Sequence, residues 1–575
     1  MYLRKCRKVV NGVTYSYWQL VESYRSERGP RQRVVANLGD MGHPARLGTA
    51  IAARGSQDVQ QPGLTGDRVE PEWVEVDVSR VRVEQVRDYG AYWLGLQVLD
   101  KLGLVEFLGT VMPLGREDVP WSLMATVLVL MRLVQPCSEL EIAEGWFERS
   151  ALGQLLGIPA NKVNDDRLYR ALDQVLPHKA ALEEYLTNRL GQLFQLEYDL
   201  LLYDITSTYF EGQCAANQQA RFGYSRDKRP DCKQVLIALV VSREGMPLGY
   251  EQLAGNRADV TTVQEIVEKI EKQYGKAGRI WVMDRGMVSE KNLDFLRKEG
   301  RRYIVGSHRG QLRQFREELA SEEGWEEIAI GLRAKLVTPT GSEECFVLCR
   351  SDARGVKEKA MLARFEQRIE AGLQALTEAC GKRRLGQGQV ERRIGALLGR
   401  NSRARGLFKV QVGTREDGGA TVEWQRRDEQ SKWVQLQEGC YLLRTNVVGN
   451  APELWRNYIQ LTEVEAAFRI QKSDLRIRPI WHQKEERVAA HILVCFLAYV
   501  VWKTLGQMCV AAGLGNDPRK IIDELSGIKM VDVVLPIRSG VELRRRYIST
   551  PTASQAVLLD RLRLRLPGKE SLLPL

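Results

Sequence analysis

Three carboxylates in this 575-residue chain stand in sequence contexts that could hold divalent metal ions. Asp204 follows the apolar run Leu-Leu-Tyr, Asp284 follows Ile-Trp-Val-Met, and Glu465 lies in a helical pattern. Carboxylate oxygens are hard ligands suited to Mg²⁺. Two such ions about 4 Å apart can activate an attacking hydroxyl and neutralise a transferring phosphoryl group. We therefore predict a two-metal site for phosphoryl transfer on nucleic acid, with the two aspartates at the ends of strands.

Each of these carboxylates, taken singly, has an ordinary explanation. An Asp at a strand end is most often a cap or turn residue, and a Glu on a helix usually faces solvent. The prediction depends on their joint order of strand, strand and helix. Asp199 competes with Asp204 for the first position, but we expect it at the opposite end of the same strand.

The residues around Glu465 are spaced to share one side of a helix. At about 100° per residue, Tyr458, Leu461, Glu465, Arg469 and Lys472 fall within about 80° of one another. The stripe thus combines a phenol, a carboxylate and two cations. An ordinary amphipathic helix would explain Glu465 and Arg469 as an i, i+4 salt bridge, but not the coincidence with the two aspartates.

The elements that must position these acids follow a recognisable order between residues 197 and 305. Apolar and amphipathic patterns predict strands over 198–210, 234–242 and from 248, a helix over 261–274, a strand over 279–284, a helix over 289–300 and a strand from 303. This β-β-β-α-β-α-β order is that of an RNase H-like core. In that core the first and fourth strands lie side by side and bring acidic residues together.

A closing helix for this core appears only near Leu454, so the intervening residues must form an inserted domain rather than a loop. A long charged helix is expected over 356–379, followed by strands beginning near 406, 420 and 440. Positively charged side chains predominate between the helix and the strands, which favours contact with DNA phosphates. These cations are Lys382, Arg383, Arg384, Arg392, Arg393, Arg400, Arg403, Arg405 and Lys409.

The sequence therefore predicts an α/β protein with several domains, as its length requires. We expect a β-rich module with a linker over 1–80, a helical domain over 85–196, an RNase H-like mixed sheet with flanking helices over 197–305 and 446–512, a β-rich insertion over 306–445, and a C-terminal region over 513–575. Arg167 and Arg170 fit either a helix-turn-helix that reads DNA or a helical bundle with solvated arginines. The end of the C-terminal region, from Arg561, could be a strand, a dimer contact or a solvated end.

Composition and charge limit the class of protein further. The net charge of +11 favours an anionic partner. No apolar run near Met1 resembles a signal peptide, and the longest apolar stretch, 488–501, is shorter than a membrane span and is interrupted by His491. We expect a soluble, cytoplasmic, nucleoid-associated protein with reduced thiols. Zinc binding at Cys345 and Cys349 lacks partner ligands nearby.

The motif around Glu465 resembles a known family signature. Tyr458-x2-Leu461-x3-Glu465-x6-Lys472 is similar to the Y-x2-R-x3-E-x6-K pattern of DDE transposases from bacterial insertion sequences, in the branch with a β-rich insertion. The segments Leu475-Arg-Ile-Arg-Pro-Ile-Trp-His, Arg487-Val-Ala-Ala-His, Tyr224-Ser-Arg-Asp-Lys-Arg-Pro-Asp and Gly255-Asn-Arg-Ala-Asp look like one subgroup of that branch. Leu461 departs from the usual Arg, although Arg469 could replace its contact.

The resemblance implies that Asp204, Asp284 and Glu465 bind two Mg²⁺ ions, for which Mn²⁺ would substitute. It implies that Tyr458 and Lys472 contact phosphates of double-stranded DNA at the transposon end. Cleavage would free a 3′-OH that attacks target DNA, within a homodimer that pairs two ends. Some members of this branch hold a flipped base on a tryptophan of the insertion; Trp424 and Trp433 are candidates, though Trp in a β-domain is more often part of the core.

Three other classes remain as alternatives. A structure-selective nuclease with the same core would hydrolyse DNA without joining strands. A non-catalytic DNA-binding protein derived from a transposase would have no need of three mutually repulsive acids. A glycoside hydrolase would use paired carboxylates, but sugars require no basic insertion.

Overall fold

The computed structural model describes residues 2–10, 13–26, 29–39, 75–196, 198–275, 278–537 and 540–567. The chain divides into two compact units. The first comprises residues 1–198, 204–258 and 462–575, and the second comprises residues 199–203 and 259–461.

The first unit begins with a three-stranded antiparallel sheet of β1 (Tyr2–Val10), β2 (Val13–Ser26) and β3 (Gly29–Gly39). Residues 40–74, which would include the linker expected within the first 80 residues, lie outside the described residues. Helices follow, principally α2 (Gly90–Leu102), α3 (Leu104–Val111), α4 (Trp121–Val134), α8 (Asp165–Val175) and α9 (Lys179–Phe194). Asn164 caps α8 by accepting from the backbone N–H of Arg167 at 2.8 Å.

The two arginines of α8 are both paired with acids. Arg170 lies 2.9 Å from Asp166, with both side chains well exposed, and Arg167 lies 3.9 Å from Asp118. The exposed Arg170 agrees with the alternative of a solvated arginine on a helical bundle, whereas the Arg167 side chain is only 20% exposed.

The core of the first unit is built around α18 (Glu485–Ala511), against which α2, α4 and α8 pack. This 27-residue helix is long and apolar enough to cross a membrane, so the expectation that the apolar stretch is too short was wrong. However, 94% of its apolar window is buried inside the protein. The burial identifies α18 as a core helix, whose apolar character reflects packing on all sides.

Strand β5 (Leu200–Tyr209) is followed in the first unit by the antiparallel hairpin of β6 (Gln234–Ser242) and β7 (Pro247–Ala254). A separate three-stranded sheet joins β4 (Arg82–Asp88) to β16 (Lys529–Pro536) and β17 (Glu542–Ile548). Helices α19 (Pro518–Leu525) and α20 (Ala553–Arg561) complete this part. Helix α20 ends at Arg561, and the described residues after it form a turn and then irregular structure. The alternative that these residues form a strand was therefore wrong.

The second unit confirms the predicted order of the core. Strand β8 (Ile280–Met283) pairs in parallel with the start of β5, from Leu200↔Ile280 to Tyr203↔Met283, and β9 (Arg302–Gly306) pairs in parallel with β8. Helices α10 (Val263–Tyr274) and α11 (Glu290–Lys298) connect them. The first and fourth strands therefore lie side by side. Antiparallel strands β15 (Cys440–Thr445), β12 (Cys345–Ser351), β11 (Leu332–Val337) and β10 (Glu326–Ala329) extend the sheet beyond β9.

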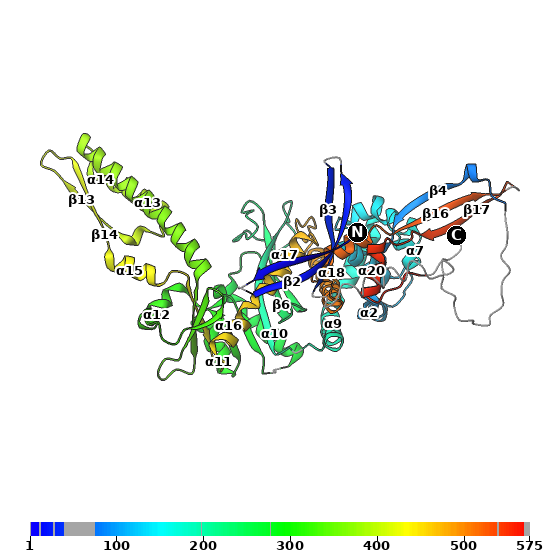
Figure 1. Ribbon diagram of the computed structural model, residues 1–575, viewed down its shortest axis with the longest axis horizontal. Coiled ribbons are helices and arrows are strands. Elements are labelled where there is room, and N and C mark those ends of the chain that lie inside the picture. Colours follow the sequence, from blue (N-terminus) through cyan, green and yellow to red (C-terminus); the bar gives the residue numbers. More distant parts are fainter. Residues whose placement is uncertain are drawn as a thin grey trace. The chain divides into compact units, whose positions relative to one another are not determined.

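An insertion leaves the sheet after β12 and returns at β15 (Figure 1). It contains α13 (Asp352–Lys382), α14 (Gln387–Arg400), β13 (Phe408–Thr414), β14 (Ala420–Arg426) and α15 (Asp428–Leu436). Ile369 and Leu373 of α13, Val390 of α14 and Phe408 of β13 share its small apolar core. The insertion is thus a helical hairpin packed on a two-stranded sheet.

The expected closing helix is two helices, α16 (Ala451–Ile459) and α17 (Leu461–Ser473), with a break at Gln460. Tyr458 lies on α16, whereas Glu465, Arg469 and Lys472 lie on α17. The single helical stripe predicted from residue spacing was therefore wrong for Tyr458. It applies only to the residues from Leu461 onward.

Candidate active site

Asp204 lies within β5, which continues for five residues beyond it to Tyr209. Its side chain is half-buried, and its Oδ1 accepts from the backbone N–H of Ile205 at 2.8 Å. The expectation that Asp204 marks a strand end was therefore wrong. By contrast, β8 ends at Met283, so Asp284 is the first residue beyond its strand, as predicted. The parallel pairing ends at Tyr203↔Met283, and Asp204 and Asp284 are the residues that directly follow this last pair in the sequence.

Asp284 is exposed and has one phenolic neighbour within the second unit. Tyr458 Oη donates to Asp284 Oδ1 at 3.4 Å. Burial raises the pKa of Tyr458, and the adjacent Asp284 charge adds to the rise, so the phenol stays a proton donor at neutral pH. A Cβ at Gly306 would come within 2.6 Å of the Tyr458 oxygen, so this glycine leaves the space that the tyrosine occupies.

A cavity of about 530 Å³ opens beside Asp284 in the second unit. Three arginines line it: Arg285, Arg309 and Arg354. Arg309 and Arg354 each lie 3.0 Å from Glu358, whereas Arg285 makes no ion pair with any residue that the structure describes. The aromatic wall includes Tyr441, which accepts a hydrogen bond from Trp455 Nε1 at 2.7 Å. A basic cavity of this kind suits a phosphate group.

Glu465 belongs to the first unit, on α17. Glu465 and Arg469 are both exposed, and within the described part of the chain neither makes an ion pair. The i, i+4 salt bridge that offered an ordinary explanation for these residues is therefore not formed. Leu461, at the start of α17, is 8% exposed, so the family's usual arginine is replaced here by a packed residue.

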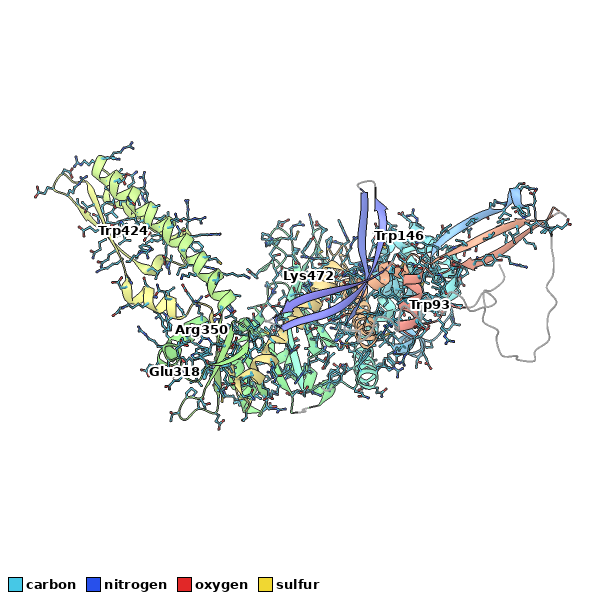
Figure 2. All side chains as sticks on the ribbon, viewed as in Figure 1. Trp93, Trp146, Glu318, Arg350, Trp424 and Lys472 are labelled. Carbon is cyan, nitrogen blue, oxygen red and sulfur yellow. The ribbon has the colours of Figure 1, made fainter. Side chains whose placement is uncertain are left out.

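Lys472, labelled in Figure 2, is engaged by an acid that sequence reasoning missed. Its Nζ lies 2.9 Å from Asp227 Oδ1, and Arg478 pairs with the same oxygen. The Asp227 side chain is only 3% exposed. Burial lowers the pKa of Lys472, and the hydrogen bond to Asp227 opposes that shift. The segment 224–231 was noted for its family resemblance, but nothing in the spacing assigned Asp227 a partner some 245 residues away.

The cations predicted to contact DNA in the insertion are all on its surface. They occupy the end of α13 and the residues just after it, helix α14, the turn before β13 and β13 itself. They comprise Lys382, Arg383, Arg384, Arg392, Arg393, Arg400, Arg403, Arg405 and Lys409. Trp424, on β14 in Figure 2, is half-buried with its ring centroid 6.1 Å from that of Phe408. Trp433 is 7% exposed. Trp424 thus packs on the core of the insertion, whereas Trp433 packs in a separate cluster with Phe315, Phe346 and Leu442, which lie outside the insertion.

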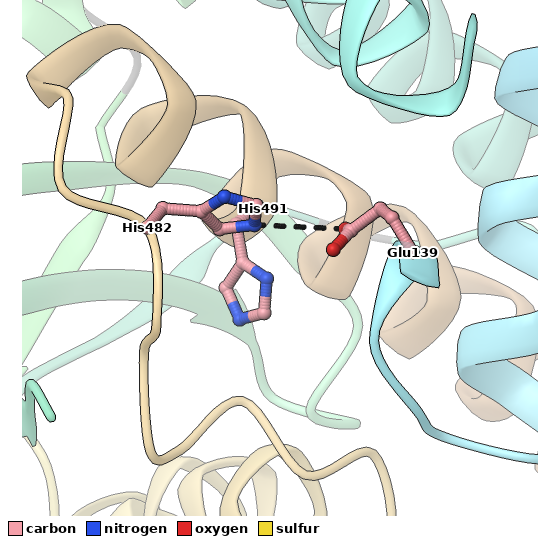
Figure 3. Close-up of side chains that lie close together, drawn as sticks. All are labelled: Glu139, His482 and His491. Carbon is pink, nitrogen blue, oxygen red and sulfur yellow. Dashed lines mark ion pairs between the residues drawn. The ribbon is translucent and has the colours of Figure 1, made fainter. Parts of the chain in front are cut away.

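Figure 3 shows a second cluster with metal-ligating groups, formed in the first unit by Glu139, His482 and His491. Burial lowers the pKa of His491 to about 3, so its ring is neutral. Its Nε2–H then donates to the Ile477 carbonyl at 3.1 Å, and its Nδ1 accepts from Arg132 at 3.5 Å. Both ring nitrogens are therefore occupied, and the arginine opposes a cation. This cluster does not fit the oxygen-ligated magnesium pair.

Comparisons with known proteins complete the description. A family model described as "Transposase DDE domain" matches residues 195–501, and one described as "IS1634 family transposase, N-terminal domain" matches residues 3–61. No curated protein matches the chain. Among solved structures, a "piggyBac transposase synaptic complex with hairpin DNA" is similar at 10% identity and a TM-score of 0.35, covering 76% of this chain and 78% of that one.

Proposed function

We propose that this chain, which belongs to the DDE transposases of insertion sequences, cleaves DNA at the ends of its element and joins the freed 3′-OH to target DNA. Asp204, Asp284 and Glu465 would be the catalytic acids. The observation that carries the proposal is the register of β5 and β8, whose parallel pairing ends one residue before each aspartate.

The donor set fits a pair of hard divalent cations. Asp284 and Glu465 are exposed, and Asp204 is half-buried. Within the described part of the chain, neither Asp284 nor Glu465 forms an ion pair with a Lys or Arg side chain. Carboxylate oxygens of this kind hold Mg²⁺, and Mn²⁺ accepts the same ligands. When bound, two such ions would activate the attacking hydroxyl and stabilise charge on the phosphate.

The chain's own residues would bind and orient the DNA strand. The protonated Tyr458 phenol keeps a donor beside Asp284, and Arg285 offers a cation with no competing acid among the described residues. Arg469 is exposed on the same helix as Glu465 and can reach a phosphate. Lys472, which Asp227 holds in place through an ion pair, would contact a DNA phosphate. The exposed cations of the insertion, from Lys382 to Arg405, would contact the DNA backbone, and Trp424 would support them from the packed strand β14.

The helical region 85–196 would bind the terminal repeats, and pairing of two ends would require a homodimer on DNA. A structure-selective nuclease with the same acids is the second candidate. It is distinguished by strand joining, because a nuclease releases its cut strand to water whereas a transposase transfers the 3′-OH to a second duplex.

The test is strand cleavage and joining with Mg²⁺ on duplexes taken from the two borders of the reading frame. Asp204→Asn, Asp284→Asn and Glu465→Gln should each lower cleavage at least about hundredfold while retaining binding in a gel-shift assay. Asp199→Asn, in the turn just before the strand of Asp204, and Glu486→Gln, exposed on α18, are matched controls that should cleave normally. Wild-type cleavage by any of the three acid variants would refute the assignment.

A further inference from the structure

Among the residues from 75 onward whose side-chain exposure the structure describes, the exposed aromatic side chains are concentrated on two loops of the first unit. Apart from Tyr547, which is 37% exposed, they are Phe222 (59%), Tyr224 (85%) and Trp481 (66%). We call residues 221–233 and 476–484 the two-loop face. Isolated exposed aromatics are ordinary, but three on two adjoining loops form a surface with an apolar, planar character that needs a partner.

Cations without partners accompany these rings. Arg221, Lys228, Arg476 and Lys484 are exposed and make no ion pair with any described residue. The acids of the face are already engaged, because Asp227 pairs with Lys472 and Arg478, and Asp231 pairs with Arg229 at 2.8 Å. The unneutralised charge of the two-loop face is therefore positive.

Arg478 of one loop pairs with Asp227 of the other, and hydrogen bonds tie residues 476–484 to the end of β5 and the turn after it. Ile480 donates its N–H to the Tyr209 carbonyl at 3.0 Å and accepts from Glu211 N–H at 3.0 Å. Gln483 accepts from Cys214 N–H at 2.8 Å. Strand β5 also carries Asp204, five residues before Tyr209, which corresponds to about 17 Å along an extended strand.

Beside Trp481 the face is hollowed. A cavity of about 540 Å³ has apolar walls that include Trp481, Tyr169 and Pro479. Its charged lining comprises Arg132, Arg476 and Arg478 together with Glu139, which lies 3.6 Å from His482, and Glu141. Small-ligand pockets fall in the range of roughly 300–1,000 Å³. The cavity therefore has room for one nucleotide, with aromatic surface for a base and guanidinium groups for a phosphate.

We propose that the two-loop face binds unpaired DNA nucleotides, with bases stacked on Trp481 and Tyr224 and phosphates held by Arg476, Lys228 and Arg221. This inference rests on the proposed function, since it supplies a site for strand separation near the cleaved end. Base stacking on exposed aromatics distinguishes unpaired DNA from a duplex, whose bases are already stacked and whose backbone needs only cations.

The experiment measures binding of a fluorescein-labelled oligothymidylate and of a duplex of equal length to the full chain, by anisotropy, in EDTA. Trp481→Ala and Tyr224→Ala should each weaken binding to the single strand about tenfold or more and change binding to the duplex less than about threefold. Trp481→Phe should restore most of the affinity because it keeps a ring. Tyr547→Ala and Lys291→Gln, an exposed tyrosine and an exposed lysine outside the face, are the matched controls.

A 2-aminopurine within the single strand gives an independent readout, because stacking quenches its fluorescence and Trp481→Ala should relieve the quenching. Wild-type affinity in both alanine variants overturns the proposal, as does an equal loss for single strand and duplex. A change in molar mass by light scattering, without a change in single-strand affinity, would instead make the face a contact between two copies of the chain.

The two hypotheses fail separately. If the wild-type protein cleaves element ends but Trp481→Ala binds single strands normally, the face is misassigned and the transposase function stands. If single-strand binding depends on Trp481 but no end is cleaved, the face stands and the proposed function fails.

Discussion

Substitution of Asp227 by Asn would remove the one acid shared by Lys472 and Arg478. At the 2.9 Å separation of Lys472 Nζ and Asp227 Oδ1, the Coulomb attraction is about 6 kcal/mol for an effective dielectric constant of about 20. Desolvation offsets much of this, but breaking a buried pair costs about 3–5 kcal/mol because it leaves an uncompensated charge. With side-chain exposures of 11% for Lys472 and 30% for Arg478, we expect a loss of about 2–4 kcal/mol.

The partner substitution should cost less. Lys472→Met keeps the apolar stem, and Arg478 remains to neutralise Asp227, so about 1–2 kcal/mol is expected. A double-mutant cycle of Asp227→Asn and Lys472→Met, measured by denaturant midpoints, should therefore give an interaction energy of about 1–3 kcal/mol. Additivity within about 0.5 kcal/mol, or an Asp227→Asn variant no less stable than Lys472→Met, would refute the reasoning.

The pH dependence provides a further check on the same variant. Without Asp227, burial and the nearby charges of Arg478 and Arg226 all act in one direction and lower the pKa of Lys472 below that of the unfolded chain. The unfolded state then binds more protons than the folded state just below pH about 10.4, so stability rises with pH in that window. The deficit of Asp227→Asn relative to the double variant should accordingly shrink from pH 8 to pH 10.

Two further predictions concern Gly306 and His491. Gly306→Ala should displace Tyr458 from Asp284, because the new Cβ would meet the phenol oxygen at 2.6 Å, and should lower end cleavage about tenfold or more. The control is Gly310→Ala, whose Cβ meets nothing within 4 Å. Equal cleavage by the two variants would contradict the role of Tyr458. His491 has a folded-state pKa lowered to about 3, below the unfolded value of about 6.5, so stability should fall as pH drops below about 6.5, by up to about 1.4 kcal/mol per pH unit. Because the pKa of Glu139 is lowered to about 2, the stability that Glu139 contributes is lost only below pH about 4.5. Thermal midpoints between pH 7.5 and 5 should therefore fall more steeply for the wild type than for His491→Gln. Parallel curves would count against a buried neutral ring.

The succession of elements in the core could be predicted from sequence because each is encoded locally. Apolar runs such as Ile280–Met283 and the amphipathic pattern of α10 fix their own secondary structure, and the parallel adjacency of β5 and β8 follows from their order. The position of Asp284 just beyond a strand followed in the same way.

The contacts between distant segments could not be predicted. Nothing in a periodic pattern indicates that the helix breaks at Gln460, since no Gly or Pro stands at or beside this position. The pairing of Asp227 with Lys472 joins residues far apart in the chain, and the neutral state of His491 follows from burial that only the fold supplies. The exposure of Trp481 likewise required the structure.

The insertion closes on itself at its base. Ser351 N–H donates to the Gly439 carbonyl at 3.1 Å, and β12 and β15 pair directly from Cys345↔Thr445 to Arg350↔Cys440, so the chain departs and returns at one point. The entropy of closing such a loop grows only with the logarithm of its length, by about 0.6 kcal/mol for each doubling. Lengthening or shortening α13 and α14 therefore perturbs the sheet little. The distance to which the insertion extends its basic surface can differ between relatives, while the pairing register of β5 and β8 stays the same.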